Sequence, residues 1–539
     1  MTGSTDAAAA PIGMPADLAA AFEAYERAIG ANDLDALDAA FAPGADTMRG
    51  DAAGLLVGHD RISAFRSVRG GVAPRTIAQI EYRPLADDTA LITSVSRYDG
   101  GGTGLQTQVW QRDGDRWLIV AAHVTGRTPA FDRALWRTVG DPLYQGAWEG
   151  PLAGLTVAVK DLFAIKGYRI GAGNPTFLDE ARPEPTTAPA VADLLRGGAS
   201  LRGIARTDEF AYSIAGDNVH YGTPANGAVP GTLPGGSSSG PATAVATGQA
   251  DVGLATDTAG SVRVPASYQG LWGLRTTHGL VPRQGMLPLA QSFDTVGWLT
   301  RDGVTLQRVA DWCLGYDGSE STEAVYGSSQ TDLPWRFVVP DEVLAAADAG
   351  TRAAFEGMLA ALAAGDDAPH VAHAPIGDLD AYLAPFRAVQ GAEAWRNNGA
   401  WVTGHPGAVG AAVADRFGAA AQVSGPDEIQ ARAALVPLRA RMDAVTRDAV
   451  LLLPVVPGPA PSRVAPPAEI DRVRTATLRM TTPAAVGGLP ALAVPLLRVG
   501  GAPVGVGLVS AADTDIALVR LGRRLARALT ASAFGRTMS

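Results

Sequence analysis

Two runs of small residues and one lysine are the parts of this sequence best suited to covalent chemistry. The runs are LPGGSSSGPATAVATG, residues 233–248, and GLATDTAGSVRVPAS, residues 253–267, and Lys160 stands in the apolar segment LTVAVKDLFAI. A serine hydroxyl needs a positioned base at neutral pH, yet the sequence marks out no Asp-His pair for that task. A lysine can serve instead if burial among apolar side chains lowers its pKa.

Three other interpretations of the Gly/Ser runs are weaker. A flexible linker would stay polar, whereas both runs lead into ordered apolar sequence such as SYQGLWGL. A phosphate-binding loop would carry a Gly-Lys-Ser/Thr ending or a G-x-G-x-x-G pattern, and neither run does. Residues 236–240 formally match the G-x-S-x-G nucleophile elbow with Ser238 at its centre. However, an elbow follows an apolar strand, and here the approach is the Pro- and Gly-broken NGAVPGTLPG.

The order and spacing of VAVKDLF, PGGSSSG and TDTAGSVR resemble the amidase-signature family. The resemblance covers about residues 150–535, includes AGNPTF, TDEFAYSIAGDNVHYGTP, QSFDTVGWLTRD, VQGAEAWRNNGAW and GGLPALAVP, and points to the indoleacetamide-hydrolase and carboxybiuret-hydrolase branch. It implies an α/β sandwich with a mixed central sheet. It also implies an amidase that acts on non-peptide carbon–nitrogen bonds of linear amides through an acyl-enzyme, releasing a carboxylic acid and ammonia or an amine.

The resemblance assigns a Ser-Ser-Lys triad residue by residue. Ser261 becomes the nucleophile, Ser237 the bridging serine and Lys160 the base, and the peptide bond between Gly236 and Ser237 is expected to be cis. Burial around Lys160 supports this role physically, because a neutral amine can accept the proton that Ser237 relays from Ser261.

The turn that presents Ser261 exposes consecutive backbone amides, which suit an oxyanion hole for a tetrahedral intermediate. We expect the amides of Thr258, Ala259 and Gly260, next to that of Ser261, to supply it. Relatives more often have two glycines before the nucleophile, so Ala259 is a departure that alters acyl or leaving-group space without removing an amide donor.

We expect other residues either to support the site or to have no catalytic role. We expect Asp257 and Arg263 to hold the nucleophile loop through hydrogen bonds and Ser238 to support Lys160 or Ser237. Weaker assignments to substrate binding fall on Ala211, Tyr212, Gln291 and the 375–450 region. The histidines His220 and His278 have no task in a Ser-Ser-Lys relay and are expected to be structural or to line the pocket.

Composition limits the partners. The 44 basic and 54 acidic residues leave a net charge of −10, and the basic residues are scattered, which argues against nucleic acid. No run reaches the roughly 18 apolar residues of a membrane span, and no export signal is evident. The single cysteine, Cys313, fits a reducing compartment, so we expect a cytoplasmic protein. His370 and His373 are isolated in an expected loop, and we expect no metal and no cofactor.

The N-terminal part has a different pattern. Apolar residues recur at helical spacing between Ala16 and Phe41, and β-rich segments separated by turn signals follow between Thr76 and Val124. This order resembles the ketosteroid-isomerase-like (SnoaL-like) cone, whose members often dimerise, so we expect a homodimer. His123 with Asp46 or Arg66 could be imagined as an acid–base set there, but no cluster of titratable residues supports that reading. The expected division is a flexible leader at 1–14, the cone at 15–127, a helical and turn linker at 128–149 and the catalytic domain at 150–535.

The remainder alternates between apolar β segments and Ala-rich helices, with residues 340–450 mostly helical. Three functional alternatives to amide hydrolysis stay open. Ester or carbamate hydrolysis would use the same machinery. A non-enzymatic scaffold on an amidase-like fold would be expected to have lost the serines or the lysine. The transamidating subunit of a tRNA amidotransferase is disfavoured by the extra N-terminal cone and by the lack of a basic run. The physiological substrate, a small-molecule amide or urea-like compound, cannot be read from spacing.

Overall fold

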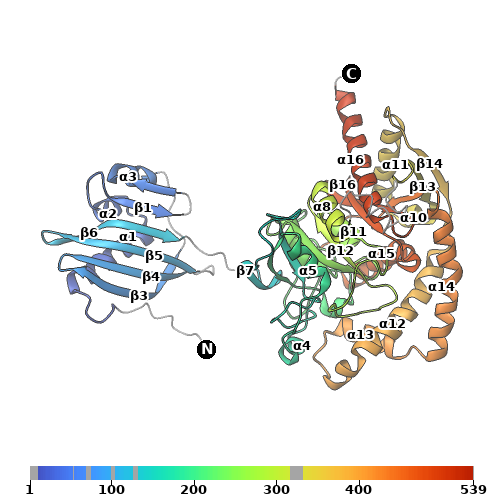
Figure 1. Cartoon of the computed structure of the whole chain (residues 1–539), viewed down its shortest axis with the longest axis horizontal. Helices are drawn as coiled ribbons and strands as arrows, with labels where there is room; N and C mark the ends of the chain where they lie inside the picture. The colour runs from blue at the N-terminus through green and yellow to red at the C-terminus, as the bar shows by residue number, and fades with distance from the viewer. Residues whose placement is uncertain are drawn as a thin grey trace. The chain divides into compact units, whose positions relative to one another are not determined.

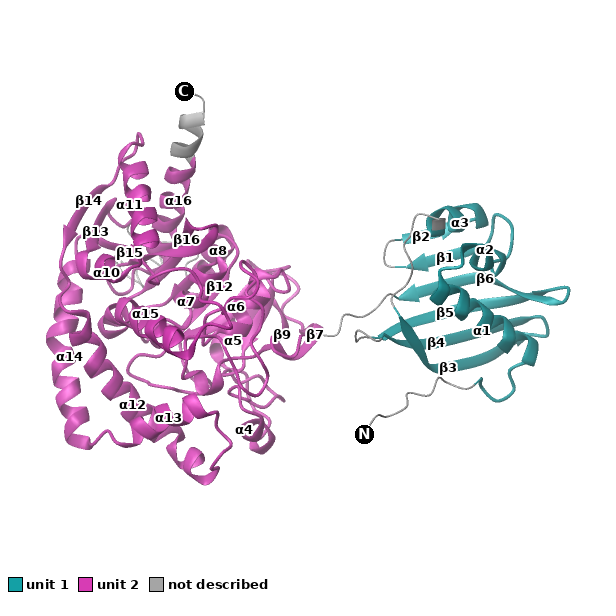
Figure 2. Cartoon of the chain, turned by 180° about the vertical axis from the view of Figure 1, so that it is seen from behind, with its two compact units in different colours: residues 1–131 teal, residues 132–539 magenta. Residues whose placement is uncertain are grey.

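The computed structural model describes residues 10–51, 54–67, 74–98, 103–125, 132–315 and 332–537. The chain divides into two compact units, residues 1–131 and 132–539, each with its own sheet (Figure 2). Residues 1–9 of the predicted leader at 1–14 lie outside the described residues.

The first unit is a small α+β fold. Its six-stranded sheet has the order β2-β1-β6-β5-β4-β3, in which β1 and β6 run parallel and the other neighbours run antiparallel. The predicted helices and four-stranded meander are confirmed, whereas β1, β2 and α3 were not predicted, because such short segments carry too little periodicity. The elements are α1 (Ala16–Ala31), α2 (Leu34–Ala39), β1 (Met48–Asp51), β2 (Gly54–Val57), α3 (His59–Ser67), β3 (Arg75–Ala86), β4 (Thr89–Tyr98), β5 (Thr103–Asp113) and β6 (Arg116–Thr125).

One face of this sheet is covered by α1, as Figure 2 shows. Leu18, Phe22 and Tyr25 of α1 pack in one core with the strand residues Trp110 and Ile119. The apolar positions of α1 therefore form the helical stripe that the sequence predicts.

The second unit is an α/β fold around a mixed sheet of 11 strands, ordered β14-β13-β15-β17-β16-β11-β12-β10-β8-β9-β7 (Figure 1). The predicted α/β class and mixed sheet are confirmed. The strands are β7 (Trp136–Tyr144), β8 (Thr156–Lys160), β9 (Ser200–Ala205), β10 (Val252–Asp257), β11 (Trp272–Arg275), β12 (Thr295–Thr300), β13 (Arg336–Pro340), β14 (His370–Ala374), β15 (Val450–Pro454), β16 (Ala491–Val499) and β17 (Ala502–Val509).

Helices cover this sheet and extend from one end of it. Helix α12 packs against α13, α14 and α15 (Figure 1). Helices α12, α13 and α14 form the helical region expected between about 375 and 450, and α15 comes from a later segment. The helices are α4 (Pro175–Glu180), α5 (Pro189–Arg196), η1 (Glu209–Ala211), α6 (Ser239–Ala246), α7 (Arg263–Gln269), α8 (Gly303–Cys313), α10 (Asp341–Ala346), α11 (Ala349–Ala363), α12 (Leu379–Gly404), α13 (Ala411–Ala421), α14 (Gly425–Thr446), α15 (Pro467–Gly487) and α16 (Asp515–Thr537).

Two local predictions were wrong. The predicted helical linker at 128–149 contains β7, which pairs antiparallel with β9, so the described part of this segment belongs to the second unit. His370 and His373 lie in β14, which pairs parallel with β13, and not in a loop. No helix among the described residues is long and apolar enough to cross a membrane.

Three neighbouring parallel strands position the chemistry. β8 lies between β10 and β9, and all three run in the same direction, so their carboxyl ends meet at one sheet edge. β8 and β10 are buried along nearly their whole length, as expected for strands covered on both faces. Lys160 is the last residue of β8, Asp257 is the last residue of β10, and Asp208 follows β9 shortly after its end.

Candidate active site

Lys160 is fully buried at the end of β8 and is surrounded by hydroxyl groups. Its Nζ lies 2.8 Å from Ser237 Oγ, 2.9 Å from Ser238 Oγ and 2.8 Å from Thr256 Oγ1. Among the described residues it forms no ion pair with a carboxylate. Burial lowers the pKa of Lys160 to about 7, although Asp208, Asp257 and Asp294 act in the opposite direction. The amine is thus substantially neutral at neutral pH and can accept a proton.

The Ser238 hydroxyl fixes how the amine can be oriented. Ser238 Oγ donates to the carbonyl oxygen of Thr256 at 3.2 Å, so its hydrogen is already used. Ser238 Oγ must therefore accept a hydrogen from Lys160, since a hydroxyl has only one hydrogen to give. A neutral Lys160 that donates its second N–H to Thr256 Oγ1 then has its lone pair directed to Ser237.

The loop around Ser237 is held by the segment that follows β9. The predicted cis peptide bond between Gly236 and Ser237 is present. The Ser237 carbonyl oxygen accepts from the Asp208 amide at 3.2 Å and from Thr207 Oγ1 at 2.9 Å. The Gly236 amide donates to the carbonyl oxygen of Ile214 at 2.8 Å. These bonds fix the backbone on both sides of the cis bond.

Ser261 lies in the turn between β10 and α7 and is 3% exposed. Its carbonyl oxygen accepts from the Ser238 amide at 3.3 Å, so the two Gly/Ser runs meet as predicted. The preceding Gly260 has φ +132°, and a Cβ there would come within 3.0 Å of Val264 Cγ2 and 3.2 Å of Thr481 Oγ1. This position of the turn therefore requires glycine.

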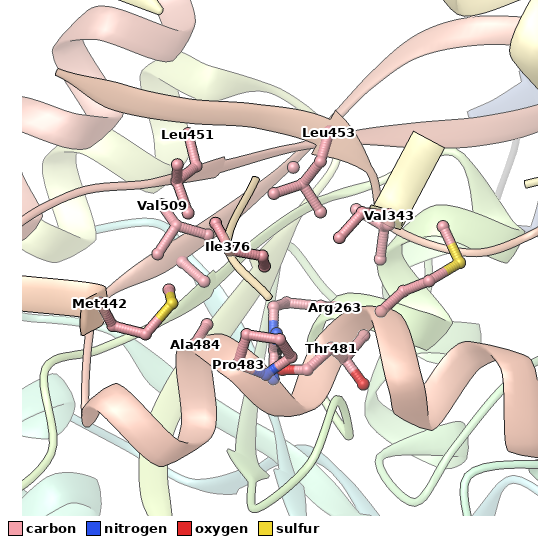
Figure 3. Close-up of a pocket in the computed structure, with 14 residues that line it drawn as sticks. Arg263, Val343, Ile376, Met442, Leu451, Leu453, Thr481, Pro483, Ala484 and Val509 are labelled. Carbon is pink, nitrogen blue, oxygen red and sulfur yellow. Dashed lines mark hydrogen bonds between the residues drawn. The ribbon is translucent and has the colours of Figure 1, made fainter. Parts of the chain in front are cut away.

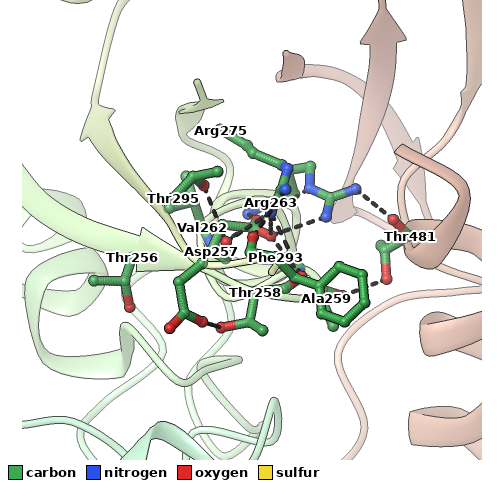
Figure 4. Close-up of polar contacts among 12 residues, drawn as sticks. Thr256, Asp257, Thr258, Ala259, Val262, Arg263, Arg275, Phe293, Thr295 and Thr481 are labelled. Carbon is green, nitrogen blue, oxygen red and sulfur yellow. Dashed lines mark hydrogen bonds and ion pairs between the residues drawn. The ribbon is translucent and has the colours of Figure 1, made fainter. Parts of the chain in front are cut away.

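Asp257 is the anchor of this turn (Figure 4). Arg263 donates to it through Nε at 3.0 Å and Nη2 at 2.9 Å, and Arg275 donates through Nη1 at 3.0 Å. The Val262 amide donates to the same carboxylate at 3.1 Å. Burial opposes ionisation of Asp257, but the two arginines outweigh it and hold its pKa well below the usual range. The hydrogen bonds expected for Asp257 and Arg263 are therefore present, and Arg275 adds to them.

A second set of contacts holds the turn from the other side. Thr258 Oγ1 donates to Asp294 Oδ1 at 2.7 Å, and Thr481 Oγ1 of α15 donates to the carbonyl oxygen of Ala259 at 2.5 Å. Arg263 Nη1 donates to the carbonyl oxygen of Thr481 at 2.9 Å (Figure 4). The turn is thus tied to β10, to α15 and to the loop before β12.

The predicted oxyanion hole needs one correction. The Gly260 amide donates to Asp257 Oδ1 at 2.8 Å, so it is not free for a substrate oxygen. Within the described part of the chain, the amides of Thr258, Ala259 and Ser261 donate to no protein acceptor. These three can take the role, and Gly260 instead keeps the turn attached to Asp257.

The residues weakly assigned to substrate binding lie in two different places. Ala211 and Tyr212 close the short η1 segment near the Ser237 loop, Ala211 with φ +55°, and Tyr212 lines a cavity of about 400 Å³. Gln291 exchanges hydrogen bonds with Asn397 of α12 and lines another cavity of about 430 Å³, whose lining includes Asp294. The second cavity reaches the nucleophile turn through Asp294, which accepts from Thr258. The first lies beside the segment that leads to Ile214, whose carbonyl oxygen accepts from the Gly236 amide.

A third cavity, of about 20 Å³, lies behind the turn and is shown in Figure 3. Arg263 and Thr481 border it, and the remaining lining is almost entirely aliphatic, including Ile376, Leu453 and Val509. Its size admits no more than a water molecule, and an apolar lining does not hold one well. It is a packing gap in the core and not a substrate site.

The histidines lie outside the lysine–serine cluster, as expected. His220 Nε2 lies 2.7 Å from Glu209 Oε1, and His278 Nε2 lies 2.9 Å from the carbonyl oxygen of Gln291. In the first unit, His123 is exposed, whereas Arg66 stacks on the core ring of Phe41. The structure therefore does not bring together the acid–base set imagined there. No group of three or more possible metal ligands occurs within the described ranges.

Besides Arg275 and Thr481, other polar residues of the site were not predicted. Thr256 contacts Lys160, Asp208 holds the Ser237 loop, and Asp294 binds Thr258. Burial raises the pKa of Asp208 and raises that of Asp294 to about 6. One signal was available in the sequence: Thr256 and Asp208 lie close to the carboxyl ends of parallel strands, where polar residues tend to be functional.

Comparison with known proteins agrees with this geometry. Residues 127–519 match the Amidase family, and residues 11–128 match the AtzH-like family. The chain is 35% identical over 395 residues to Amidase 1 of Arabidopsis thaliana, covering 70% of this chain and 93% of that protein. Two solved structures are also similar. One is an amidase crystal structure, with TM-score 0.64, 29% identity and coverage of 72% of this chain and 91% of that one. The other is an inhibitor-bound complex that concerns the origins of an s-triazine catabolic enzyme, with TM-score 0.63, 29% identity and coverage of 70% and 85%.

The chain belongs to the amidase-signature family and carries an AtzH-like domain at its N-terminus. It is accordingly a hydrolase of carbon–nitrogen bonds. An AtzH-like domain is compatible with the SnoaL-like cone predicted for this region, and the more specific branch within the family stays a prediction.

Proposed function

We propose that the protein hydrolyses a small linear amide through an acyl-enzyme on Ser261. Ser261 Oγ attacks the amide carbon, its proton passes to Ser237 Oγ, and the Ser237 proton passes to Lys160 Nζ. The carbon–nitrogen bond then breaks as the relay returns a proton to the leaving nitrogen. Water attacks the acyl ester through the same relay, and the carboxylic acid is released.

The observation that carries this proposal is the environment of Lys160. Its Nζ lies 2.8 Å from Ser237 Oγ in a buried site, and no carboxylate of the described segments forms an ion pair with it. An ammonium held there solely for structure would be expected to have a counter-ion, because an unpaired buried charge is costly. Hydroxyl partners alone suit an amine that alternates between neutral and charged forms.

The free amides of the turn support the same reaction. Attack by Ser261 places negative charge on the former carbonyl oxygen, and the amides of Thr258, Ala259 and Ser261 are available to donate to it. Because Asp257 and Thr481 fix the turn beforehand, little reorganisation accompanies charge development.

Replacing Ser261 with alanine tests the assignment. A panel of aliphatic, aryl and urea-type amides is scored for ammonia release, and the best substrate is then given to Ser261→Ala. We expect the loss of kcat to be at least about 10⁴-fold, as for other serine nucleophiles. Ser462→Ala, an exposed serine outside the site, is the matched control. Unchanged turnover by Ser261→Ala would exclude this nucleophile.

An ester or carbamate could use the same relay, since it does not distinguish leaving groups. An amide and an ester with one shared acyl group separate these possibilities. Equal kcat for both would indicate rate-limiting deacylation, and the acylation rates in single-turnover experiments then decide. Acylation by the ester with none by the amide would contradict amide hydrolysis.

We also propose that the first unit pairs with a second copy of the chain. The face of its sheet opposite α1 has an apolar centre, in which Leu91 pairs with Val109 and Val109 with Ala121. On the same face Val95 pairs with Leu105, which is 44% exposed. The pair Thr93–Thr107 lies between these two apolar groups. A sheet face on which apolar side chains are partly exposed in this way is typical of an interface.

Light scattering at micromolar concentration tests this pairing. We expect a dimer for the natural chain and a monomer for Val109→Lys, with Ala24→Lys on the exposed side of α1 as a control for added charge. A monomeric natural chain would contradict the proposal. A cytoplasmic location, expected from the single cysteine, is likewise a proposal and is tested by cell fractionation.

A further inference from the structure

Three arginines from three helices converge on the cavity of about 400 Å³ beside Tyr212. Arg387 comes from α12, Arg416 from α13 and Arg474 from α15. Asp471 is the one acidic residue in the lining, so the described walls carry an excess of two positive charges. A volume of this size accommodates a small organic molecule.

The positive charge in this cavity is poorly compensated. Asp471 lies 3.4 Å from Arg474 Nη1 and is itself 72% exposed, so this pair is weak. Arg474 is only 20% exposed, and its Nε is buried without a hydrogen-bond partner. Arg416 donates through Nη1 to the carbonyl oxygen of Tyr212 at 2.8 Å. Arg387 makes no hydrogen bond or ion pair with any described residue.

The nearby carboxylate of Asp380 interacts electrostatically with Arg387 but is bound mainly by another arginine. Asp380, one of the nearer acids on α12, is engaged by Arg479 through two hydrogen bonds of 2.7 and 2.9 Å. Burial, together with the charges of Arg416 and Arg387, lowers the pKa of Arg474 to about 10. Three guanidinium groups so placed favour an anion that enters the cavity.

Two walls of the cavity are connected through the chain to the segments that hold the reacting groups. Tyr212 stands two residues before Ile214, whose carbonyl oxygen accepts from the Gly236 amide next to Ser237. Leu478 of α15 lines the cavity, and Thr481, one turn further, donates to the carbonyl oxygen of Ala259. Arg474 and Thr481 are seven residues apart, about 10 Å along a helix.

We propose that this cavity binds a carboxylate of the substrate, so that the enzyme acts on mono-amides of small dicarboxylic acids. Guanidinium groups match the geometry and charge of a carboxylate better than other side chains do. The separation along α15 favours an amide and a carboxylate joined by a chain of a few carbons. The inference rests on the proposed amidase function, because it assigns the substrate of the same site.

The test compares ω-carboxy amides, from succinamate to adipamate, with neutral alkanamides of equal chain length. We expect the natural enzyme to prefer the acid in kcat/KM by a factor on the order of 100. Arg474→Met should reduce this ratio to below about fivefold, and Arg474→Lys should retain part of it. Arg472→Gln is the matched control, since it removes the same charge from the same helix outside the cavity lining, and it should keep the ratio.

A binding measurement separates this inference from the proposed reaction. Glutarate is titrated calorimetrically into Ser261→Ala and into the double variant with Arg474→Met, and binding is expected only in the first. If the natural enzyme hydrolyses neutral amides as well as acidic ones, the inference fails and the amidase function stands. If no amide is hydrolysed but glutarate binds through Arg474, the inferred carboxylate site stands and the proposed reaction fails. Displacement of glutarate by lower concentrations of inorganic phosphate would overturn the carboxylate assignment.

Discussion

Lys160 and Asp257 occupy equivalent places in the fold but have opposite electrostatic surroundings. Each is the last residue of a buried strand, and the two strands, β8 and β10, are parallel neighbours. Lys160 is surrounded by three hydroxyl groups, whereas Asp257 accepts from two arginines and three backbone amides. Burial thus lowers the pKa of the lysine to about 7, while the aspartate stays ionised.

The difference shows how one sheet edge holds both a reactive and a fixed group. A general base must exist in both protonation states near the working pH, so its surroundings must leave the charged form uncompensated. An anchor must keep a single charge state, so its surroundings must compensate that charge fully. Replacing Lys160 should therefore abolish activity, whereas removing the charge of Asp257 should mainly lower stability.

The largest effect is expected when Lys160 is replaced by methionine, which has a similar length and no charge. We expect kcat/KM to fall by about 10⁴-fold or more, because the relay then ends at Ser237 without a base. The fold should persist, since the site already favours an uncharged side chain, and circular dichroism checks this. Retention of activity within tenfold would show that Lys160 is not the base.

Replacing Asp257 with asparagine should reverse the outcome and act mainly on stability. Arg263 and Arg275 would lose their shared counter-ion in a buried site, which costs about 3–5 kcal/mol of unfolding free energy. Urea unfolding measures the change. Asp251→Asn is the matched control, because Asp251 precedes the same strand but pairs with Arg301 near the surface, where a loss of at most about 1 kcal/mol is expected. Equal losses of unfolding free energy in the two variants would show that burial of the ion pair does not determine its contribution to stability.

The pH dependence of kcat/KM tests the lowered pKa of Lys160 directly. Because the neutral amine is the active form, activity should be nearly full above about pH 8, half-maximal near pH 7, and should fall as the pH decreases further. Below the pKa the decrease should reach about tenfold per pH unit. A profile that stays flat down to pH 5, with the fold intact, would contradict a neutral lysine base.

Ser238→Ala should have a smaller effect, because it changes only the orientation of the amine. Without the Ser238 oxygen, one N–H of Lys160 loses its acceptor and the lone pair is no longer held toward Ser237. We expect kcat to fall about tenfold. The midpoint of the pH profile should also move to lower pH, since the charged form loses a hydrogen bond. A purely structural role would lower activity without moving that midpoint.

The sequence was sufficient for the parts of the site that lie in continuous motifs. Ser237, Ser261 and Lys160 were predicted as the triad because their flanking residues resemble the motifs of the family. The structure places Lys160 beside Ser237 and brings the two serine runs together, and their catalytic roles stay a prediction. Asp294 and Arg275 could not, because they reach the turn only through the pairing of distant strands. The direction of the Gly260 amide depends on φ +132° of that residue, which residue types do not reveal.

The fold, too, could be predicted where the signal is local and not where it depends on distant pairing. Long alternating or apolar segments predicted β4, β8 and β16, since periodicity accumulates over their length. β7 was missed because Gly140 and Pro142 interrupt its pattern. Proline is tolerated there because β7 is the edge strand of the sheet, a position that depends on the complete strand order.

Ala259→Gly should have the smallest effect on kcat. It tests whether the backbone hydrogen bonds alone hold the nucleophile turn in place. Ala259 is buried, its carbonyl oxygen accepts from Thr481, and its amide is one of the three that remain free. Glycine keeps both backbone groups and removes only a methyl, so we expect kcat to change by no more than about twofold and stability by about 1 kcal/mol. If the methyl borders the acyl space, as the family resemblance implies, bulkier acyl groups should gain most, and a panel of acyl sizes measures this. A tenfold loss of kcat on all substrates would show that the hydrogen bonds that Asp257 accepts and Thr481 donates do not suffice to hold the oxyanion amides.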